Sequence, residues 1–367
     1  MKIAIACGGS GGHIFPGLAV AQALYEHGHK ILLLVSEKEI DSITLQVHPE
    51  FRFEKLLSTS LPSPLSPTVI QFLWHAWKNL IRCHEIFRRY QPKVVLSMGG
   101  FASTISVIVA RMAGIPSYIH EANSIPGRAN RLGAKFASRI LLGFEECKTF
   151  FPKVECVVTG TPIRNTLTKR IAREQALTTL RLDPLRKTLL VIGGSQGSLG
   201  INQLFFRAAP LLRNMPLQII HLTGAQEGAH LAINNNYLRE NIPAYVVAFH
   251  HHMEQAFSCA DLVISRAGAS SLSEIAYFGL ASILIPYPFA TDNHQASNAS
   301  IFVRATAAEM LLEPYTTPEI LAQLIANLLN DECRRQHMAQ QAKKVLFSHE
   351  ATQRIVDIIE RGHDYYK

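Results

Sequence analysis

The sequence predicts two α/β domains, each built on an open, parallel, Rossmann-like sheet. Short continuous apolar segments alternate with stretches of helical periodicity, the pattern of strands that are buried on both faces. The unit of strand, glycine-rich loop and helix then recurs along a chain of 367 residues, a length typical of two domains. This period is much longer than that of a solenoid, so a repeat protein is excluded.

The first of these units opens the chain. An apolar strand is expected over Lys2–Ala6, and it runs into the loop of residues 8–13, which contains four glycines. Apolar residues at helical spacing then predict a helix, and residues 31–35 a second buried strand. The order of strand, helix and strand indicates a parallel sheet.

Three further strands precede loops rich in glycine and serine. They are expected over residues 93–97, 188–192 and 262–265, with the loops at 98–104, 193–198 and 266–271. A helix over residues 351–360 ends the pattern, with isoleucines spaced for one face. The two halves are therefore related, and we expect the boundary between them after Pro162, in the turn-rich segment 159–162.

Composition excludes several classes of protein. Apolar residues make up 48% of the chain and charged residues 17%, which is a globular composition and not that of a disordered chain. No apolar run reaches the ~18 residues of a spanning helix, and the first strand is too short for a signal sequence. We therefore expect a cytosolic protein. The six cysteines form no C-x-x-C pair, which predicts reduced thiols and neither disulfides nor a zinc site.

The net charge of +8 favours an anionic partner. Residues 1–163 carry most of the excess, with 17 basic and 11 acidic residues. Phosphates, an anionic membrane surface or nucleic acid would fit such a surface. Nucleic acid requires a basic groove with stacking aromatic residues, whereas most Phe and Tyr fall at expected core positions, so we expect no nucleic-acid partner.

The glycine loops direct backbone N–H groups and helix N-termini towards one point, which attracts phosphate. Two such domains facing each other would form an interdomain cleft at the carboxyl ends of their strands. A P-loop is excluded because no Lys-Ser/Thr follows the required glycines, and the dinucleotide fingerprint fails at Ile14. The alternative is that the glycines serve only tight turns.

Six motifs, taken in order, resemble those of the MurG family of peptidoglycan N-acetylglucosaminyltransferases (undecaprenyl-diphospho-muramoylpentapeptide β-N-acetylglucosaminyltransferases). They are Gly-Gly-Ser-Gly-Gly-His-Ile-Phe-Pro-Gly-Leu-Ala at 8–19, His-Glu-Ala-Asn at 120–123, Gly-Thr-Pro-Ile-Arg at 160–164, Gly-Gly-Ser-Gln-Gly at 193–197 with Asn202, Ser-Arg-Ala-Gly-Ala at 265–269 through Glu274, and Asp-Asn-His-Gln at 292–295 with Asn298. Each motif alone is weak evidence. Together they cover nearly the whole chain and are specific.

The resemblance implies the GT-B fold and an inverting transfer of GlcNAc from UDP-GlcNAc to the C4 hydroxyl of MurNAc in lipid I, which gives lipid II for peptidoglycan synthesis. Residues 1–162, rejoined by a last helix at about 347–363, would bind lipid I and the membrane, and residues 163–346 would bind the donor. The partners implied are UDP-GlcNAc, lipid I, an anionic membrane surface and proteins of cell-wall synthesis or cell division. No metal or other cofactor is implied.

The same resemblance assigns the donor-binding residues. Glu274 would accept hydrogen bonds from the ribose hydroxyls, as an acceptor-only carboxylate suits a diol; its alternative role is a charge that complements a helix dipole. Arg164 would neutralise the leaving UDP. The other donor-site residues are Ser195 and the N–H groups of Ala269, Ser270, Ser271, Leu272 and Ser273 for the diphosphate, Asn202, His250 for uracil through its main chain, and Gln295 and Asn123 for the sugar.

The loop of Ser10, Gly11, Gly12 and His13 would meet the acceptor and the donor sugar. His13 is the first candidate for the base that takes the hydroxyl proton, since it titrates near neutrality. Its alternative roles are to bind the acceptor diphosphate or to pack within the loop. Glu121 is the second candidate base, with a structural role as its alternative. The three adjacent histidines at 250–252 point in different directions, so no metal site is expected there.

Two segments are candidate membrane or acceptor surfaces. The basic residues Arg128, Arg131, Lys135 and Arg139 are spaced for one helix face, which would meet phosphate or lipid headgroups unless it is only a solvated face.

In residues 69–93 we expect Ile70, Leu73, Trp77 and Leu80 in the core, and Phe72 and Trp74 on a surface that enters the bilayer interface. A plain core helix is the alternative. The resemblance favours peripheral attachment to the cytoplasmic face of the plasma (inner) membrane.

Other functions fit the same fold. A UDP-GlcNAc 2-epimerase or another GT-B enzyme would share the donor half and need no lipid-facing surface. A catalytically silent UDP-sugar-binding membrane subunit is an alternative from another class of protein. The intact loop around His13 beside an intact Glu274 argues against the silent subunit.

Overall fold

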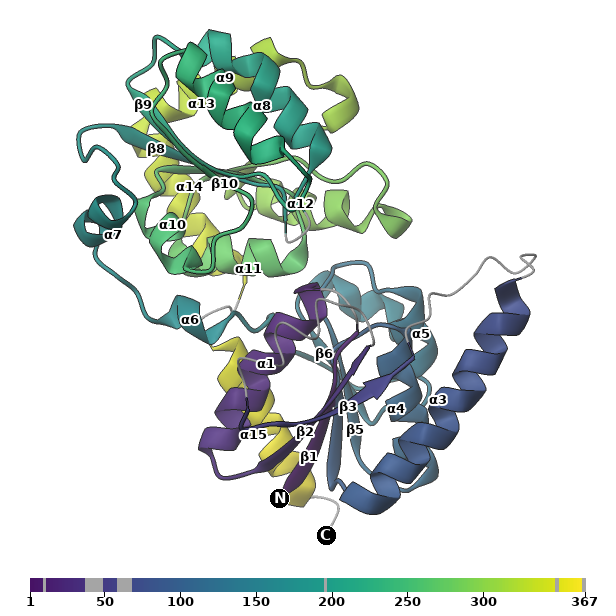
Figure 1. Ribbon diagram of the computed structural model, residues 1–367. Helices are drawn as coiled ribbons and strands as arrows, with labels where there is room; N and C mark the ends of the chain where they lie inside the picture. Colours follow the sequence, from purple (N-terminus) through teal and green to yellow (C-terminus); the bar gives the residue numbers. More distant parts are fainter. Residues whose placement is uncertain (9–10, 37–48, 58–67, 195–196, 347–349, 365–367) are drawn as a thin grey trace. The chain divides into compact units, whose positions relative to one another are not determined.

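A computed structural model describes residues 1–8, 11–36, 49–57, 68–194, 197–346 and 350–364. The chain divides into two compact units (Figure 1). Unit 1 comprises residues 1–164 and 347–367, and unit 2 comprises residues 165–346. The division falls between Arg164 and Asn165, two residues after the position expected from the turn-rich segment.

Unit 1 is built on a parallel sheet of seven strands in the order β3-β2-β1-β4-β5-β6-β7. The strands are β1 (Lys2–Ala6), β2 (Lys30–Ser36), β3 (Arg52–Leu56), β4 (Val94–Ser97), β5 (Ser117–Glu121), β6 (Arg139–Leu142) and β7 (Cys156–Val158). The chain runs outward from β1 to β2 and β3, and then from β4 to β7 in the other direction. The carboxyl ends of β1 and β4 therefore lie side by side where the direction reverses, which is the usual ligand site of such sheets.

Helices cover both faces of this sheet (Figure 1). The side chains of Ile3 and Ile5 face α1 and α15, whereas Ala4 and Ala6 face α3 and α4, because successive strand residues point to opposite faces. The helical elements of the unit are α1 (Gly11–Glu26), α3 (Thr68–Tyr90), α4 (Phe101–Met112), α5 (Arg128–Gly133), the 3-10 helix η1 (Glu145–Phe150) and α15 (Ala351–Asp364).

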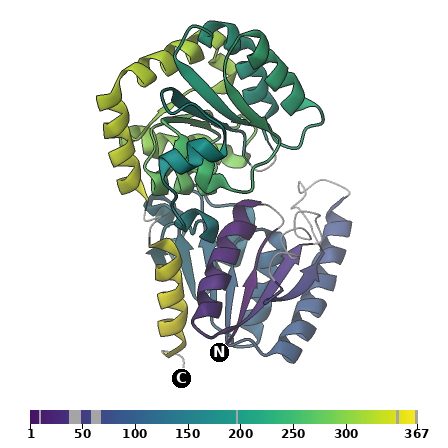
Figure 2. The same ribbon diagram turned by 60° about the vertical axis from the view of Figure 1, so that its left-hand side comes forward.

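The last helix, α15, packs beside α1 on the sheet of unit 1 (Figures 1 and 2). Ile355, Val356 and Ile359 are fully buried. One carboxylate oxygen of Glu360 lies 3.0 Å from His27 Nδ1 and 2.8 Å from His29 Nε2, which ties the helix to the segment before β2. The helix therefore completes the core of unit 1 from the far end of the sequence, since His27 and Glu360 are 333 residues apart and the whole of unit 2 lies between them.

We expect Gly362→Ala to destabilise unit 1. A methyl group at Gly362 would overlap the hydroxyl of Tyr118, whose side chain is buried in the sheet. Overpacking of this kind costs about 1–3 kcal/mol, which exceeds the gain in helix propensity. Urea unfolding followed by tryptophan fluorescence would measure the loss, because both tryptophans lie in α3. Arg361→Ala, at the exposed neighbouring position, is the control and should leave the midpoint nearly unchanged.

Unit 2 contains a parallel sheet of six strands in the order β10-β9-β8-β11-β12-β13. The strands are β8 (Lys187–Ile192), β9 (Leu217–Leu222), β10 (Ala244–Val247), β11 (Leu262–Ser265), β12 (Ser282–Leu284) and β13 (Ala308–Met310). The helical elements are α6 (Asn165–Thr168), α7 (Arg173–Thr179), α8 (Leu199–Leu212), α9 (Ala229–Arg239), α10 (Met253–Cys259), α11 (Ala269–Phe278), η2 (Thr291–Asn293), α12 (His294–Arg304), η3 (Glu313–Tyr315), α13 (Pro318–Asn330) and α14 (Glu332–Val345).

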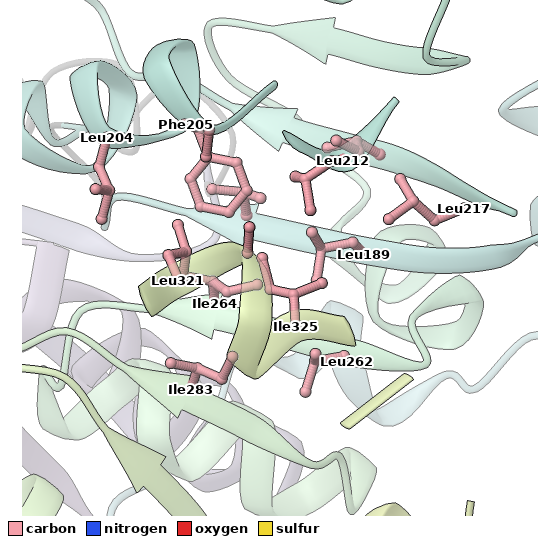
Figure 3. Packing of buried hydrophobic residues seen from close by; sticks show 14 of the residues in the cluster. Leu189, Leu204, Phe205, Leu212, Leu217, Leu262, Ile264, Ile283, Leu321 and Ile325 are labelled. Atoms are coloured by element: carbon pink, nitrogen blue, oxygen red, sulfur yellow. The ribbon is translucent and has the colours of Figure 1, made fainter. Parts of the chain in front are cut away.

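A hydrophobic core cluster of unit 2 lies between the sheet and helices α8, α9 and α13 (Figure 3). Phe205 and Leu212 of α8 and Ile325 of α13 meet Leu189 and Ile264 of the central strands, and all five are fully buried. The direction of the chain reverses between β8 and β11, as it does between β1 and β4. The predicted class, two Rossmann-like parallel-sheet domains, is therefore confirmed. None of the described helices is long and apolar enough to cross a membrane.

Candidate active-site residues in the two units

In unit 1 the loops after β1 and β4 meet backbone to backbone. Gly8 N–H donates to Gly99 O at 3.0 Å. Gly99 and Gly100 have φ values of +109° and +89°, which L side chains rarely adopt. A methyl group at Gly8 would overlap the Gly99 carbonyl. The glycines therefore permit a close approach of two loops at the point where the sheet changes direction.

His13 lies in the first turn of α1, with its imidazole against this pair of loops. Methyl groups at Gly8 and Gly99 would each contact the ring, so the ring occupies the space that the missing side chains leave. Burial lowers the pKa of His13 to about 4. The ring is therefore neutral near pH 7 and able to accept a proton. Gly11 and Gly12 begin the same helix, and Ser10 lies outside the described residues.

Glu121 ends β5 and holds the loop that follows. Its carboxylate accepts from the backbone and side-chain nitrogens of Asn123 at 2.9 and 3.2 Å, from Gly127 N–H at 3.0 Å and from the Asn130 side chain at 2.8 Å. Burial raises the pKa of Glu121, and these donors act in the opposite direction. Both oxygens are occupied by protein donors, so the geometry favours the structural alternative over the base.

Arg164 is the last residue of unit 1. Its guanidinium carbon lies 4.9 Å from the centre of the Phe15 ring, on the helix that begins beside His13. The structure thus brings this cation together with the helix that carries His13. Asn123, the other predicted donor contact in unit 1, is half-buried and linked to Glu121.

In unit 2 the glycine loop after β8 also lies close to other backbone segments. A methyl group at Gly193 would overlap the backbone nitrogen of Ser198, and one at Gly197 would overlap the carbonyl of Thr223. Ser198 caps α8 by accepting from Ile201 N–H at 3.3 Å. The loop is therefore tightly folded at its two ends. Ser195 lies outside the described residues.

The N-terminus of α11 contains the second set of predicted phosphate contacts. Its N-cap is Gly268, which has no side chain to bond the first N–H groups. Ala269, Ser270 and Ser271 supply these groups, as expected for a phosphate site. Leu272 does not fit that prediction, because its N–H already donates to Gly268 O and its side chain is in the core. The Ser273 hydroxyl donates to Ala269 O, and the role of the Ser273 N–H stays a prediction. Glu274 follows one turn further and is 7% exposed.

Asn202 does not fit its predicted role as a ligand contact. Its Nδ2 donates to Thr223 O at 3.0 Å, and its Oδ1 lies 3.1 Å from His221 Nε2. His221 Nδ1 is in turn 2.8 Å from the hydroxyl of Tyr237. Burial lowers the pKa of His221 to about 3, so the imidazole is neutral. The amide therefore belongs to a buried polar chain that links α8 to the sheet.

His250 lies in the loop after β10, and Gln295 lies in the first turn of α12. His250 is 8% exposed, its Nδ1 lies 3.3 Å from the Tyr245 hydroxyl, and burial lowers its pKa. Gln295 accepts from Tyr287 N–H at 3.0 Å through Oε1. This bond holds the amide oxygen of Gln295 against Tyr287, and the sugar contact of its amide nitrogen stays a prediction.

No group of three or more His, Cys, Asp or Glu in the described part of the chain is arranged to hold a metal ion. The adjacent histidines have separate partners: His250 contacts Tyr245, and His252 Nδ1 lies 3.1 Å from Glu254.

Sequence reasoning missed several residues that organise these loops. Asn130 donates to the Glu121 carboxylate, and no pattern in the neighbouring sequence predicted this role. Ser198 stands directly before an apolar helix, which is a recognisable N-cap signal. Arg266 is a charged residue that follows a buried strand, and it is 7% exposed. Glu313, its ion-pair partner, lies in a separate loop and had no signal.

The predicted faces of α3 are wrong at four positions, whereas Trp74 is exposed as expected. Ile70, Leu73 and Trp77 were expected in the core but are 79%, 58% and 52% exposed. Phe72, expected on the surface, packs on Phe101 with ring centres 4.4 Å apart. The helix has apolar residues on two faces, so the periodicity of the sequence does not show which face packs against the core.

Asn79 identifies the packed face of α3. It is fully buried and bonds both the N–H and the carbonyl of Leu57, at 2.8 and 2.9 Å. Leu80, half-buried beside this face, lies against the core as expected.

The four predicted basic residues do not share one helix face. Helix α5 ends at Gly133, so Lys135 follows it and Arg139 begins β6. Arg139 donates to Glu155 at 2.8 Å, and Arg131 to the carbonyl of Pro126 at 3.0 Å. The basic residues keep their helical spacing in the sequence beyond Gly133, although the helix ends there in a turn that the pattern did not predict.

Two models of one protein family match this chain. The N-terminal domain model of glycosyltransferase family 28 matches residues 3–142, and the C-terminal domain model matches residues 188–360. A protein of Halothermothrix orenii is 37% identical over 361 residues, covering 94% of this chain and 95% of that protein. One of Geobacter sulfurreducens is 34% identical and covers 97% of both. Both are named UDP-N-acetylglucosamine–N-acetylmuramyl-(pentapeptide) pyrophosphoryl-undecaprenol N-acetylglucosamine transferase.

Solved structures agree with the two-unit fold. MurG of Acinetobacter baumannii superposes with a TM-score of 0.77 at 27% identity, covering 98% of this chain and 99% of that one. A UDP-N-acetylglucosamine 2-epimerase from Listeria monocytogenes, so described in its title as putative, reaches a TM-score of 0.70 at 11% identity, covering 99% of this chain and 97% of that one. The second likeness concerns the fold alone.

Proposed function

The chain belongs to glycosyltransferase family 28, and we propose that it transfers GlcNAc from UDP-GlcNAc to the C4 hydroxyl of MurNAc in lipid I, forming lipid II. The observation that carries this proposal is the 37% identity, over 94% of the chain, to a transferase named for these substrates. The two units supply matching chemistry. Unit 2 offers a phosphate-binding helix N-terminus, and unit 1 offers a neutral imidazole at a glycine-lined sheet edge.

The donor would bind to unit 2. The first N–H groups of α11 face the carboxyl edge of the sheet, where backbone donors and the helix dipole favour a diphosphate. Glu274 lies one turn along the same helix, so a nucleotide with its phosphates at the N-terminus would place its ribose hydroxyls near that carboxylate. Gln295 would donate its amide N–H to the sugar. These roles together explain a preference for a UDP-sugar.

The acceptor would bind at the loop of His13. In the transfer, the C4 hydroxyl oxygen forms a bond to the anomeric carbon while the bond from that carbon to UDP breaks. The hydroxyl proton passes to His13, and the electron pair leaves with the diphosphate. A pKa of about 4 keeps His13 unprotonated at neutral pH, as a base must be, but it lies below the near-neutral value expected from the sequence and makes the imidazole a weaker base. Arg164, next to Phe15, would stabilise the charge on UDP.

An assay with radiolabelled UDP-GlcNAc and a lipid I analogue, with free UDP followed in parallel, tests this function. Transfer of label to the lipid product is the expected result. Release of UDP without labelled lipid would indicate hydrolysis or epimerisation instead. Tight binding of UDP-GlcNAc with neither signal would indicate a catalytically silent subunit. Either of the last two results would overturn the transferase.

We also propose that the exposed face of α3 attaches the protein to the cytoplasmic face of the plasma membrane. Its apolar side chains are Ile70, Leu73, Trp74, Trp77 and Ile81, all at least 42% exposed. Trp74 and Trp77 stack with ring centres 5.2 Å apart, and the ammonium of Lys78 lies 4.9 Å from the Trp74 ring centre. Stacked indoles beside a cation suit the interface between headgroups and acyl chains.

The double replacement Trp74→Glu and Trp77→Glu should release the protein from anionic vesicles. We expect partition to fall about tenfold or more, because burial of half an aromatic side chain is worth roughly 2 kcal/mol. Co-sedimentation with phosphatidylglycerol vesicles would measure it. Leu231→Glu with Leu238→Glu on α9 is the matched control, since those side chains are 59% and 64% exposed and lie in unit 2. Equal loss in both variants, or loss in neither, would rule out α3 as the attachment face.

A further inference from the structure

Arg266 lies at the point where the sheet of unit 2 changes direction, directly after β11 and beside the loop that follows β8. Its side chain is 8% exposed. The Nη2 group donates to Ser198 Oγ at 2.6 Å, and Nη1 donates to the carbonyls of Ile285 and Pro286 at 3.1 and 3.2 Å. One guanidinium thus joins the glycine loop after β8 to the loop after β12.

Glu313 adds a third loop to this junction. Its Oε2 lies 2.5 Å from Arg266 Nη1, and it comes from η3, after β13. The carboxylate lies against Gly200 in the first turn of α8, where a methyl group would overlap it. The absence of a side chain at Gly200 therefore leaves space for the Glu313 carboxylate.

The junction extends to Gln295. The Arg266 guanidinium lies 5.4 Å from the centre of the Tyr287 ring, and the backbone N–H of Tyr287 holds the Gln295 amide at 3.0 Å. Two parts of the proposed donor site are therefore held by one side chain: the loop beside the diphosphate, through Ser198, and the sugar contact, through Tyr287.

We propose that Arg266 and Glu313 are positioning residues. They would hold the glycine loop and Gln295 at the distance from each other that the phosphate and sugar parts of the donor require. The proposal rests on the proposed function of unit 2. The known contacts of the guanidinium are to protein groups in three loops, which a forked, planar donor can bridge and an ammonium cannot. Buried ion pairs contribute little net stability, so their value here would lie in geometry.

The test compares Arg266→Lys, Glu313→Gln and Gly200→Ala with the control Glu309→Gln. Gly200→Ala displaces the Glu313 carboxylate but leaves every side chain of the junction chemically unchanged. Glu309 also forms an ion pair with an arginine, Arg334, but on β13 away from the junction. Calorimetry with UDP-GlcNAc, UDP and uridine would give affinities, steady-state kinetics would give KM and kcat, and thermal unfolding would give stability.

We expect the three junction variants to bind UDP-GlcNAc about tenfold more weakly, a change of ~1.4 kcal/mol. UDP should lose less affinity and uridine almost none, because uridine reaches neither the loop nor Gln295. The change should appear in the donor KM more than in kcat. The double variant Gly200→Ala with Glu313→Gln should be no weaker than either single variant, since both remove one contact. Glu309→Gln should behave as the unchanged protein does.

Several results would overturn the proposal. If Arg266→Lys keeps full affinity for UDP-GlcNAc, a positive charge at this position is enough for donor binding, and the planar guanidinium does not position the loops. If affinity for uridine falls with the others, or if stability falls while affinities stay, the junction is only structural. Failure of the unchanged protein to bind UDP-GlcNAc would instead remove the proposed function, and the junction would lose its ligand with it.

Discussion

His13→Ala should lower kcat by about 10²–10⁴-fold while donor and acceptor still bind, because general-base catalysis contributes this much when the base is removed. Single-turnover kinetics at saturating substrates would separate turnover from binding. His84→Ala is the matched control, since His84 is exposed on α3. Normal turnover in His13→Ala would show that another group takes the proton.

The pH dependence provides an independent test of the same residue. Burial lowers the pKa of His13 to about 4, so kcat/KM should decline on the acid side near that value and not near 6.5. Stability must be followed in parallel. The folded-state pKa lies below the unfolded value, so the unfolded state binds the proton first; stability is full above pH 6.5 and falls as the pH drops towards 4. An acid limb near 6.5 in protein that is still folded would contradict a buried, neutral base.

Glu274→Ala should weaken UDP-GlcNAc binding by about 100-fold. Two hydrogen bonds to a charged acceptor are worth ~1.5 kcal/mol each, and each 1.4 kcal/mol is a factor of ten. Titration calorimetry would measure the change, and Glu274→Gln should be intermediate, because an amide oxygen still accepts.

The control for Glu274 tests its alternative role at a helix N-terminus. Glu319 lies in the first turn of α13, and hydrogen bonds from Thr317 and its own backbone lower its pKa. Glu319→Ala therefore removes a helix N-terminal charge in the same unit without touching the donor site. If both variants lower stability alike and leave donor affinity intact, Glu274 complements a dipole and does not bind ribose.

The central strands were predictable from the sequence because a parallel sheet buries both of their faces, so residues such as Ile3, Ala4 and Ile5 form continuous apolar runs. The edge strand β3 was not predicted, because it is partly exposed and carries charged residues. The faces of α3 were not predictable. That helix is apolar on two sides, and the decision depends on Asn79, whose partner Leu57 is 22 residues away in the sequence. Such a contact leaves no periodic signal.

The candidate site divides in the same way. Glycine loops and the helix N-terminus at Gly268 could be found because their function depends on local backbone geometry. The partners of Asn202 and Glu121 could not, since motif position does not show whether a polar side chain faces a ligand or a neighbouring strand. Asn202 lies on α8, and its buried partners His221 and Thr223 lie at the end of β9 and directly after it, about 20 residues further along the chain.

The docking of α15 has a consequence for the order in which the protein is completed during synthesis. Unit 2 is one continuous segment, residues 165–346, so every part of it is available before the last helix is made. Unit 1 begins first, yet the face of its sheet that holds Ile3 and Ile5 is covered only in part, by α1, until residues 351–364 leave the ribosome. A chain stopped shortly after residue 346 would therefore carry a complete unit 2 and a unit 1 whose core is partly open and prone to aggregation.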